Sequence, residues 1–94
     1  MSYTKYTSFQ TLDTISRHCP EALHTYLLVI LRIDKEGHAT FTKKFIKDDL
    51  CETWTKFVNN LKKLYIEGLL EFHILDSHIR ITLAHENVEE DDED

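Results

Sequence analysis

The chain has 94 residues, of which 41% are apolar, and it carries a formal net charge of −6. A chain of this length forms one domain, and this apolar content is enough for a single small core. The longest apolar run, from Tyr26 to Leu31, has six residues. A bilayer-spanning helix needs about 20. The composition therefore excludes a predicted membrane span.

The cysteine content and the first residues indicate the cellular compartment. Two cysteines, Cys19 and Cys51, are too few for a disulfide framework. The opening sequence MSYTKYTSFQ has no apolar segment of the kind that a signal peptide requires. We therefore expect a cytoplasmic protein with reduced thiols.

The negative charge is concentrated at one end of the chain. Seven of the 17 acids lie in residues 86–94, so residues 1–85 carry 10 acids against 11 Lys and Arg. Like-charge blocks repel themselves and bury nothing, which predicts a disordered acidic tail over 86–94. The tail either solubilises the chain, mimics nucleic-acid phosphate, or covers the chain's own lysines. The folded domain is predicted over 20–85, with residues 1–19 packing on it.

The first predicted helices lie on either side of Pro20. Phe9, Leu12 and Ile15 recur every third residue, which suits one or two helical turns with Ser8 as the N-cap. Pro20 is a favoured first residue for a helix that we expect to reach about residue 33. The apolar face of that helix is predicted to comprise Leu23, Tyr26, Leu27, Ile30 and Leu31.

That helix is apolar on nearly every side, since Leu28 and Val29 lie off its main face. Such a helix must be buried on more than one side. Either the N-terminal segment covers it, or a second copy of the chain forms a homodimer through Leu28 and Val29. Phe9, Leu12 and Ile15 are available for the first arrangement, which we favour.

The middle of the chain predicts a turn, a short strand and two helices. Residues 34–37 suit a turn, and residues 38–41 alternate as a short strand does. Thr42 is expected to cap a helix that runs to about Leu50, and Thr53 to cap another from Trp54 to Glu67. The second of these helices has an inward stripe of Phe57, Leu61 and Leu64.

Gly68 supplies the left-handed position that ends a helix. Residues 70–75 and 79–83 are predicted strands, and residues 76–78 a tight turn between them. Arg80 alternates with Ile79 and Ile81, so its side chain should point away from the core. The predicted core consists of Leu27, Ile30, Phe45, Ile46, Phe57, Leu61, Leu64 and Leu70.

This order of elements resembles the winged helix-turn-helix family of small transcription regulators and replication initiators, over about residues 20–84. The matching pieces are Phe41-Thr42 before the second helix, the segment LYIEGLL from Leu64 to Leu70, and HIRITL from His78 to Leu83. The resemblance implies an α+β fold. It would contain three main helices, a short strand and a C-terminal two-stranded wing.

The resemblance also implies a binding surface for nucleic acid, with duplex DNA favoured over a single strand. The third helix would enter the major groove, where Asn59 can pair with adenine and Lys62 or Lys63 can meet guanine or phosphate. The other residues carried over are Trp54, Thr55 and Val58 on that helix, and Lys43, Lys44 and Arg80 as phosphate contacts.

The chain departs from the family pattern in the turn and on the third helix. Cys51 stands where the family has glycine, Glu52 where an apolar residue is common, and Lys47 where a small residue is. Trp54 and Val58, four residues apart, predict an exposed apolar ledge. Trp54 could cover the core, stack on an unpaired base, or anchor a protein interface.

These departures support an alternative function as a protein-binding adaptor or inhibitor. It would use the Trp54–Val58 ledge and the acidic tail as a phosphate mimic.

Catalytic and metal-binding patterns are missing from the sequence. None of the six histidines pairs with a cysteine at ligand spacing, although His73 and His78 could face each other across the predicted ribbon. Gly37 and Gly68 are the only glycines, so there is no phosphate-binding loop. The sequence also lacks a nucleophile elbow and a catalytic carboxylate pair. We therefore expect no enzyme activity, no metal and no cofactor.

Overall fold

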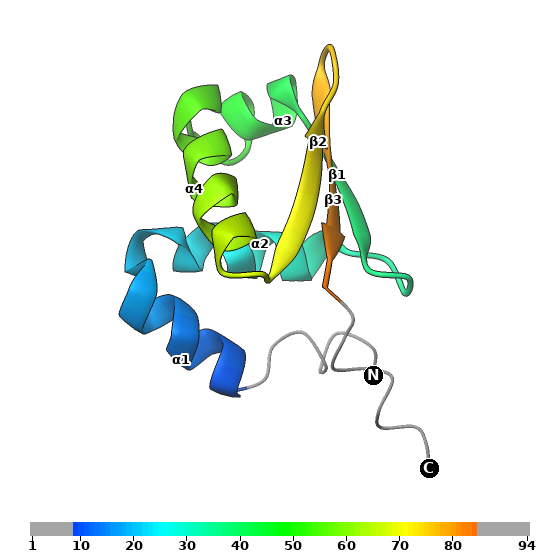
Figure 1. Ribbon diagram of the computed structural model, residues 1–94. Helices are drawn as coiled ribbons and strands as arrows, with labels where there is room; N and C mark the ends of the chain where they lie inside the picture. The colour runs from blue at the N-terminus through cyan, green and yellow to red at the C-terminus, as the bar shows by residue number, and fades with distance from the viewer. Residues whose placement is uncertain (1–8, 85–94) are drawn as a thin grey trace.

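The computed structural model describes residues 9–84. Its elements follow the chain in this order: α1 (Phe9–His18), the 3-10 turn η2 (Pro20–Ala22), α2 (Leu23–Arg32), β1 (His38–Thr42), α3 (Lys43–Asp48), α4 (Trp54–Ile66), β2 (Leu70–Ile74) and β3 (His78–Leu83). The strands form one antiparallel sheet in the order β1-β3-β2 (Figure 1). The α+β class is thus as expected, and the arrangement is compatible with a winged-helix-like fold.

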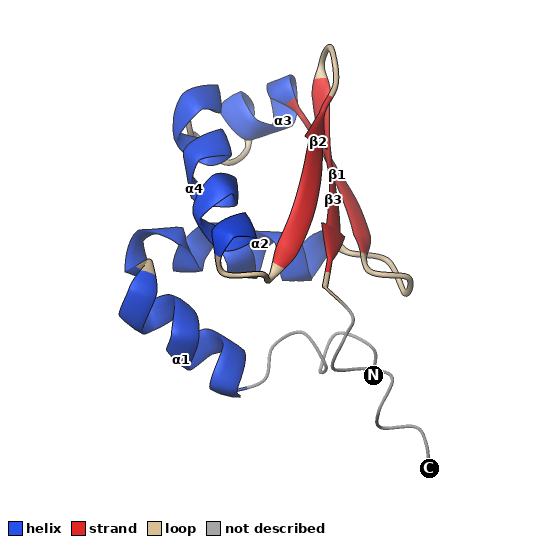
Figure 2. Cartoon of the chain, in the orientation of Figure 1, coloured by secondary structure: helices blue, strands red, loops and turns tan. Residues whose placement is uncertain are grey.

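The core lies between one face of the sheet and helices α2, α3 and α4, and Figure 2 shows α4 running alongside β2. Strand residues on this face are buried and their neighbours along β1 and β3 are not, as a half-covered sheet requires. Phe41 of β1 meets Phe57 of α4 with 5.2 Å between ring centroids. Six predicted core residues are buried: Ile30, Ile46, Phe57, Leu61, Leu64 and Leu70.

The predicted inward face of α2 is confirmed at Tyr26 and Ile30, which are buried, but the helix is rotated so that Leu27 and Leu31 lie outside the core. Leu27 is 38% exposed and Leu31 79% exposed, whereas Val29 is fully buried. The helix instead turns Thr25 inward, where Asn60 of α4 donates a buried 3.1 Å hydrogen bond to the threonine hydroxyl. Because Val29 lies in the core, it cannot form the proposed dimer surface.

Helix α1 packs on the domain through its C-terminal half. Ile15 and Cys19 are buried in the core, whereas Phe9, at the start of the helix, is 85% exposed. Figure 1 shows α1 extending away from the sheet and from α4. The helix is longer than the one or two turns expected, and the predicted cap Ser8 lies outside the described residues.

The predicted caps Thr42 and Thr53 and the predicted helix end at Gly68 are confirmed. The hydroxyl of Thr42 accepts a hydrogen bond from the Phe45 amide, and that of Thr53 accepts one from the Lys56 amide. Gly68 has φ 78°, and the Leu69 amide donates to the Leu64 carbonyl at 3.1 Å, which closes α4 in a Schellman motif. These local bonds fix where α3 and α4 begin and where α4 ends.

The hairpin differs from the prediction in register. β3 begins at His78, so the turn comprises residues 75–77. His73 lies opposite Arg80 and Ile74 lies opposite Ile79. His73 and His78 therefore do not face each other across the ribbon.

Cys51, in the turn between α3 and α4, has φ 55°, the left-handed conformation that suits glycine. Cys51 thus stands where the pattern that the sequence resembles has glycine, and it adopts a conformation that glycine favours. The Glu52 amide then donates to the Ile46 carbonyl at 3.1 Å. One carboxylate oxygen of Glu52 is buried without a hydrogen-bond partner among the described residues.

We expect Cys51→Gly to stabilise the protein, because an L-residue in this conformation costs about 1–2 kcal/mol and glycine does not. The larger chain entropy of glycine in the unfolded state offsets part of this, leaving a gain of about 0.5–1 kcal/mol. Urea denaturation measures it, with Cys51→Ala as the control that keeps the strain. Equal stability of the glycine and alanine variants would contradict the strained turn.

Candidate nucleic-acid interface

The side of α4 that faces away from the core is polar over its first turns. Thr55, Asn59 and Lys62 follow one another at intervals of four and three residues, and all are exposed. This spacing places them on one face of a helix, opposite the buried stripe of Phe57 and Leu61. Ile66 continues the same face and is exposed, so the polar part ends before the last turn. Three predicted site residues are thus brought together on a rigid element.

The predicted apolar ledge on α4 was wrong. Val58 is only 8% exposed and belongs to the core, because β2 packs against that flank of the helix. Trp54 is half-buried and packs on the core. The ammonium of Lys43 lies 4.9 Å from the centroid of its ring. The structure therefore supports the interpretation of Trp54 as a cover for the core.

The starts of α3 and α4 and the hairpin turn meet at one end of the molecule, at the top of Figure 1. The Lys43 amide donates to the Ser77 carbonyl at 2.9 Å, which attaches the hairpin turn to α3. The side chain of Lys43 contacts Trp54 at the start of α4. Lysines from α3 are thereby held near the first turn of the polar α4 face.

The predicted site lysines differ in whether they form ion pairs. Lys44 pairs with Asp48 at 2.8 Å within α3, and Lys63 pairs with Glu21 of η2 at 2.6 Å. The bond from Lys63 lowers the pKa of the Glu21 carboxyl. Exposed pairs of this kind contribute little to stability, so Lys44 and Lys63 can exchange their partners for phosphate. Lys62 is exposed and makes no ion pair with a described residue.

Sequence reasoning overlooked Lys56 as a site residue. Lys56 is exposed on the flank of α4, three residues before Asn59. The sequence could have indicated that Lys56 lies beside Asn59, because residues three positions apart are neighbours on a helix surface.

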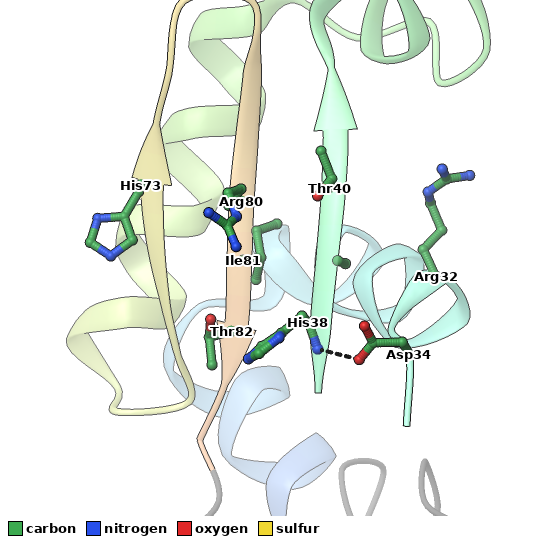
Figure 3. A pocket seen from close by; sticks show the side chains of 9 residues that line it. Arg32, Asp34, His38, Thr40, His73, Arg80, Ile81 and Thr82 are labelled. Carbon is green, nitrogen blue, oxygen red and sulfur yellow. Dashed lines mark hydrogen bonds between the residues drawn. The ribbon is translucent and has the colours of Figure 1, made fainter. Parts of the chain in front are cut away.

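Arg80 is exposed as predicted, but it lies apart from the polar face of α4. It sits on the outer face of the sheet, between Thr40 of β1 and His73 of β2 in the register. This face contains a hollow of about 520 Å³, and Figure 3 shows Arg80, Thr82 and His38 among the side chains that line it. α4 packs against the opposite face, so Arg80 and Asn59 point to different sides of the molecule.

One side chain that lines the hollow, Asp34, stabilises the turn before β1. The Asp34 carboxylate accepts hydrogen bonds from the amides of Glu36 and His38 at 2.9 and 3.0 Å. These bonds hold the pKa of Asp34 below its usual range. Arg32, at the rim, places its guanidinium 4.3 Å from the centroid of the Phe45 ring. Asp34 and Arg32 thus have structural partners already.

The two cysteines differ in their exposure. Burial raises the pKa of the Cys19 thiol, which keeps it protonated and weakly nucleophilic. Cys51 is exposed, and its thiol is 3.9 Å from the Asp48 carbonyl.

Residues 9–84 contain neither a metal-binding cluster nor a membrane-spanning helix. No group of at least three His, Cys, Asp or Glu side chains is placed to hold a metal ion. No helix in that range has the length and hydropathy to cross a bilayer.

Comparison of the chain with protein-family models, curated proteins and solved structures gave no match.

Proposed function

We propose that the chain is a winged-helix DNA-binding module of a transcription regulator or replication accessory protein, in which α4 enters the major groove of a duplex. The order of helices and strands and the sheet order β1-β3-β2 support the winged-helix assignment. The observation that carries the proposal is the exposed polar row of Thr55, Asn59 and Lys62 on a helix whose opposite side is anchored in the core.

Each residue of this row has a specific role in reading a base pair. The Asn59 side-chain NH2 can donate to adenine N7 while its amide oxygen accepts from the adenine N6 amino group, and Lys62 can donate to the acceptors of guanine. Thr55 offers a hydroxyl, and a methyl group for contact with thymine. Lys43, Lys44 and Lys56 flank the row and would bind backbone phosphates, which position the helix without reading sequence.

The protein-docking alternative loses the surface on which it was based, because Val58 is buried. Stacking of an unpaired base on Trp54 is also disfavoured, since that ring is half-buried and already contacts Lys43. Duplex DNA is therefore the partner that the exposed side chains of α4 suit best.

The proposal is tested with a duplex selected from a random pool and two alanine variants. We expect Asn59→Ala to weaken binding by about 5- to 100-fold and to relax the base preference at one position. Lys62→Ala should weaken binding and relax the preference for guanine at one position. Lys35→Ala, an exposed lysine in the turn after α2, is the charge-matched control. If neither α4 variant loses more duplex affinity than the Lys35→Ala control, the α4 face does not bind the duplex.

A further inference from the structure

A second hollow lies where the edge strand β2 meets α4. It has a volume of about 440 Å³ and is lined by Lys62 and Tyr65 of α4 and by Glu71, Phe72 and His73 of β2. β2 is at the edge of the sheet, so among the described residues no further strand covers it. The hollow therefore lies beside the unpaired edge of the sheet, at Glu71, Phe72 and His73.

The aromatic side chains in this hollow form a platform. Tyr65 is 56% exposed, although it contacts the half-buried Phe72 edge to face, with 6.4 Å between ring centroids. An aromatic ring that is held by such a contact and still exposed can accept another ring by stacking. The Tyr65 hydroxyl adds a hydrogen-bonding group at the rim.

Basic side chains lie beside the platform and around the β2 edge from it. Lys62 is on the α4 side. His73 lines both this hollow and the one on the outer face of the sheet, where Arg80 lies opposite it on β3. Figure 3 shows the His73 ring at the β2 edge and the Arg80 guanidinium on the neighbouring strand. Lys62, Tyr65, His73 and Arg80 thus form a strip around the β2 edge.

The strip carries one acidic group, the exposed Glu71. Its carboxylate repels phosphate, so the phosphates of a ligand are expected beside Lys62 and Arg80 and not at the middle of β2. At the middle of β2, the Glu71 carboxylate can accept hydrogen bonds from an amino or imino group of a base.

We propose that this β2-edge strip binds a single-stranded nucleic-acid segment, with one base stacked on Tyr65 and flanking phosphates at Lys62 and Arg80. Alternating aromatic and cationic side chains are the features by which proteins hold single strands without reading sequence. The strip shares only Lys62 with the proposed duplex face. Binding of a single strand there does not require the duplex face to bind DNA.

The test is a fluorescence-anisotropy titration of a labelled thymidine oligonucleotide at low salt. We expect Tyr65→Ala to weaken binding by about 5- to 100-fold through lost stacking, and Tyr65→Phe to retain most of the affinity. Tyr65→Leu keeps an apolar contact with Phe72 without a stacking face, so it should bind as weakly as the alanine variant. Arg80→Gln should reduce the salt slope by about 0.7, and Lys35→Gln should not reduce it.

Two comparisons separate this proposal from its competitors. An abasic oligomer of the same charge should bind more weakly than the thymidine oligomer; equal binding would mean attraction to charge alone and would overturn the proposal. Asn59→Ala should leave single-strand affinity intact, whereas Tyr65→Ala should leave duplex affinity intact. Single-strand affinity that is unchanged in both Tyr65→Ala and Tyr65→Leu would remove the platform from the site, whatever the result for the duplex.

Discussion

Replacing Leu61 with alanine is expected to lower the free energy of unfolding by about 2–5 kcal/mol. Leu61 has no exposed surface and lies on the side of α4 that packs in the core. The change deletes buried methyl groups and leaves a cavity that rigid neighbours fill only in part. Since small domains have about 5–15 kcal/mol of stability, this is a large share of the total.

Urea denaturation followed by circular dichroism measures the loss. Lys62→Ala, at the next residue on the exposed face, is the matched control and should change stability by at most about 0.5 kcal/mol. A loss for Leu61→Ala as small as that of the control would mean that α4 is rotated from the orientation described here. The proposed groove-reading face would then be wrong as well, because both faces depend on the same rotation.

Replacing Trp54 with alanine should cost about 2–3 kcal/mol of stability, less than a fully buried ring, because the side chain is only partly buried. Part of the loss comes from the contact with the Lys43 ammonium, which is worth about 0.5–1 kcal/mol at such a site. Trp54→Phe keeps a ring and should lose less. Thermal denaturation of the two variants measures the difference.

The same variants decide what Trp54 does for function. At a temperature where Trp54→Ala is folded, we expect its duplex affinity to stay close to that of the unchanged chain. If affinity falls steeply while stability is retained, Trp54 contacts the ligand directly, and its assignment as a cover for the core is wrong.

The ends of the helices could be predicted from sequence because their causes are local. Thr42, Thr53 and Gly68 act through hydrogen bonds or dihedral angles within a few residues of themselves. Such features require no knowledge of what packs against the helix. The stripe of Phe57, Leu61 and Leu64 was also predictable, since α4 has a strongly one-sided distribution of apolar residues.

The orientation of α2 could not be predicted, because its sequence is apolar on nearly every side. The choice between Leu27 and Val29 as a core residue is made by the surfaces of α4 and α1 that meet the helix. The deciding contact, between Thr25 and Asn60, joins residues 35 positions apart and consists of two polar side chains. Hydrophobic periodicity contains no signal for such a pair.

The candidate site was predicted in its polar part and mispredicted in its apolar part. Thr55, Asn59 and Lys62 are exposed as expected, because their spacing opposes the buried stripe. Val58 was misplaced since the width of the buried stripe depends on β2, which covers one flank of α4. The platform of Tyr65 and Phe72 was missed altogether, as it exists only where the edge strand meets the helix.

Amide chemical-shift mapping during titration with the selected duplex tests directly whether α4 is the element that reads the DNA. We predict that the largest shifts cluster at residues 55–62 of α4 and at the start of α3, with small shifts on the outer face of the sheet around Thr40 and Thr82. Shifts concentrated on that outer face, with the α4 amides unchanged, would contradict the proposed function.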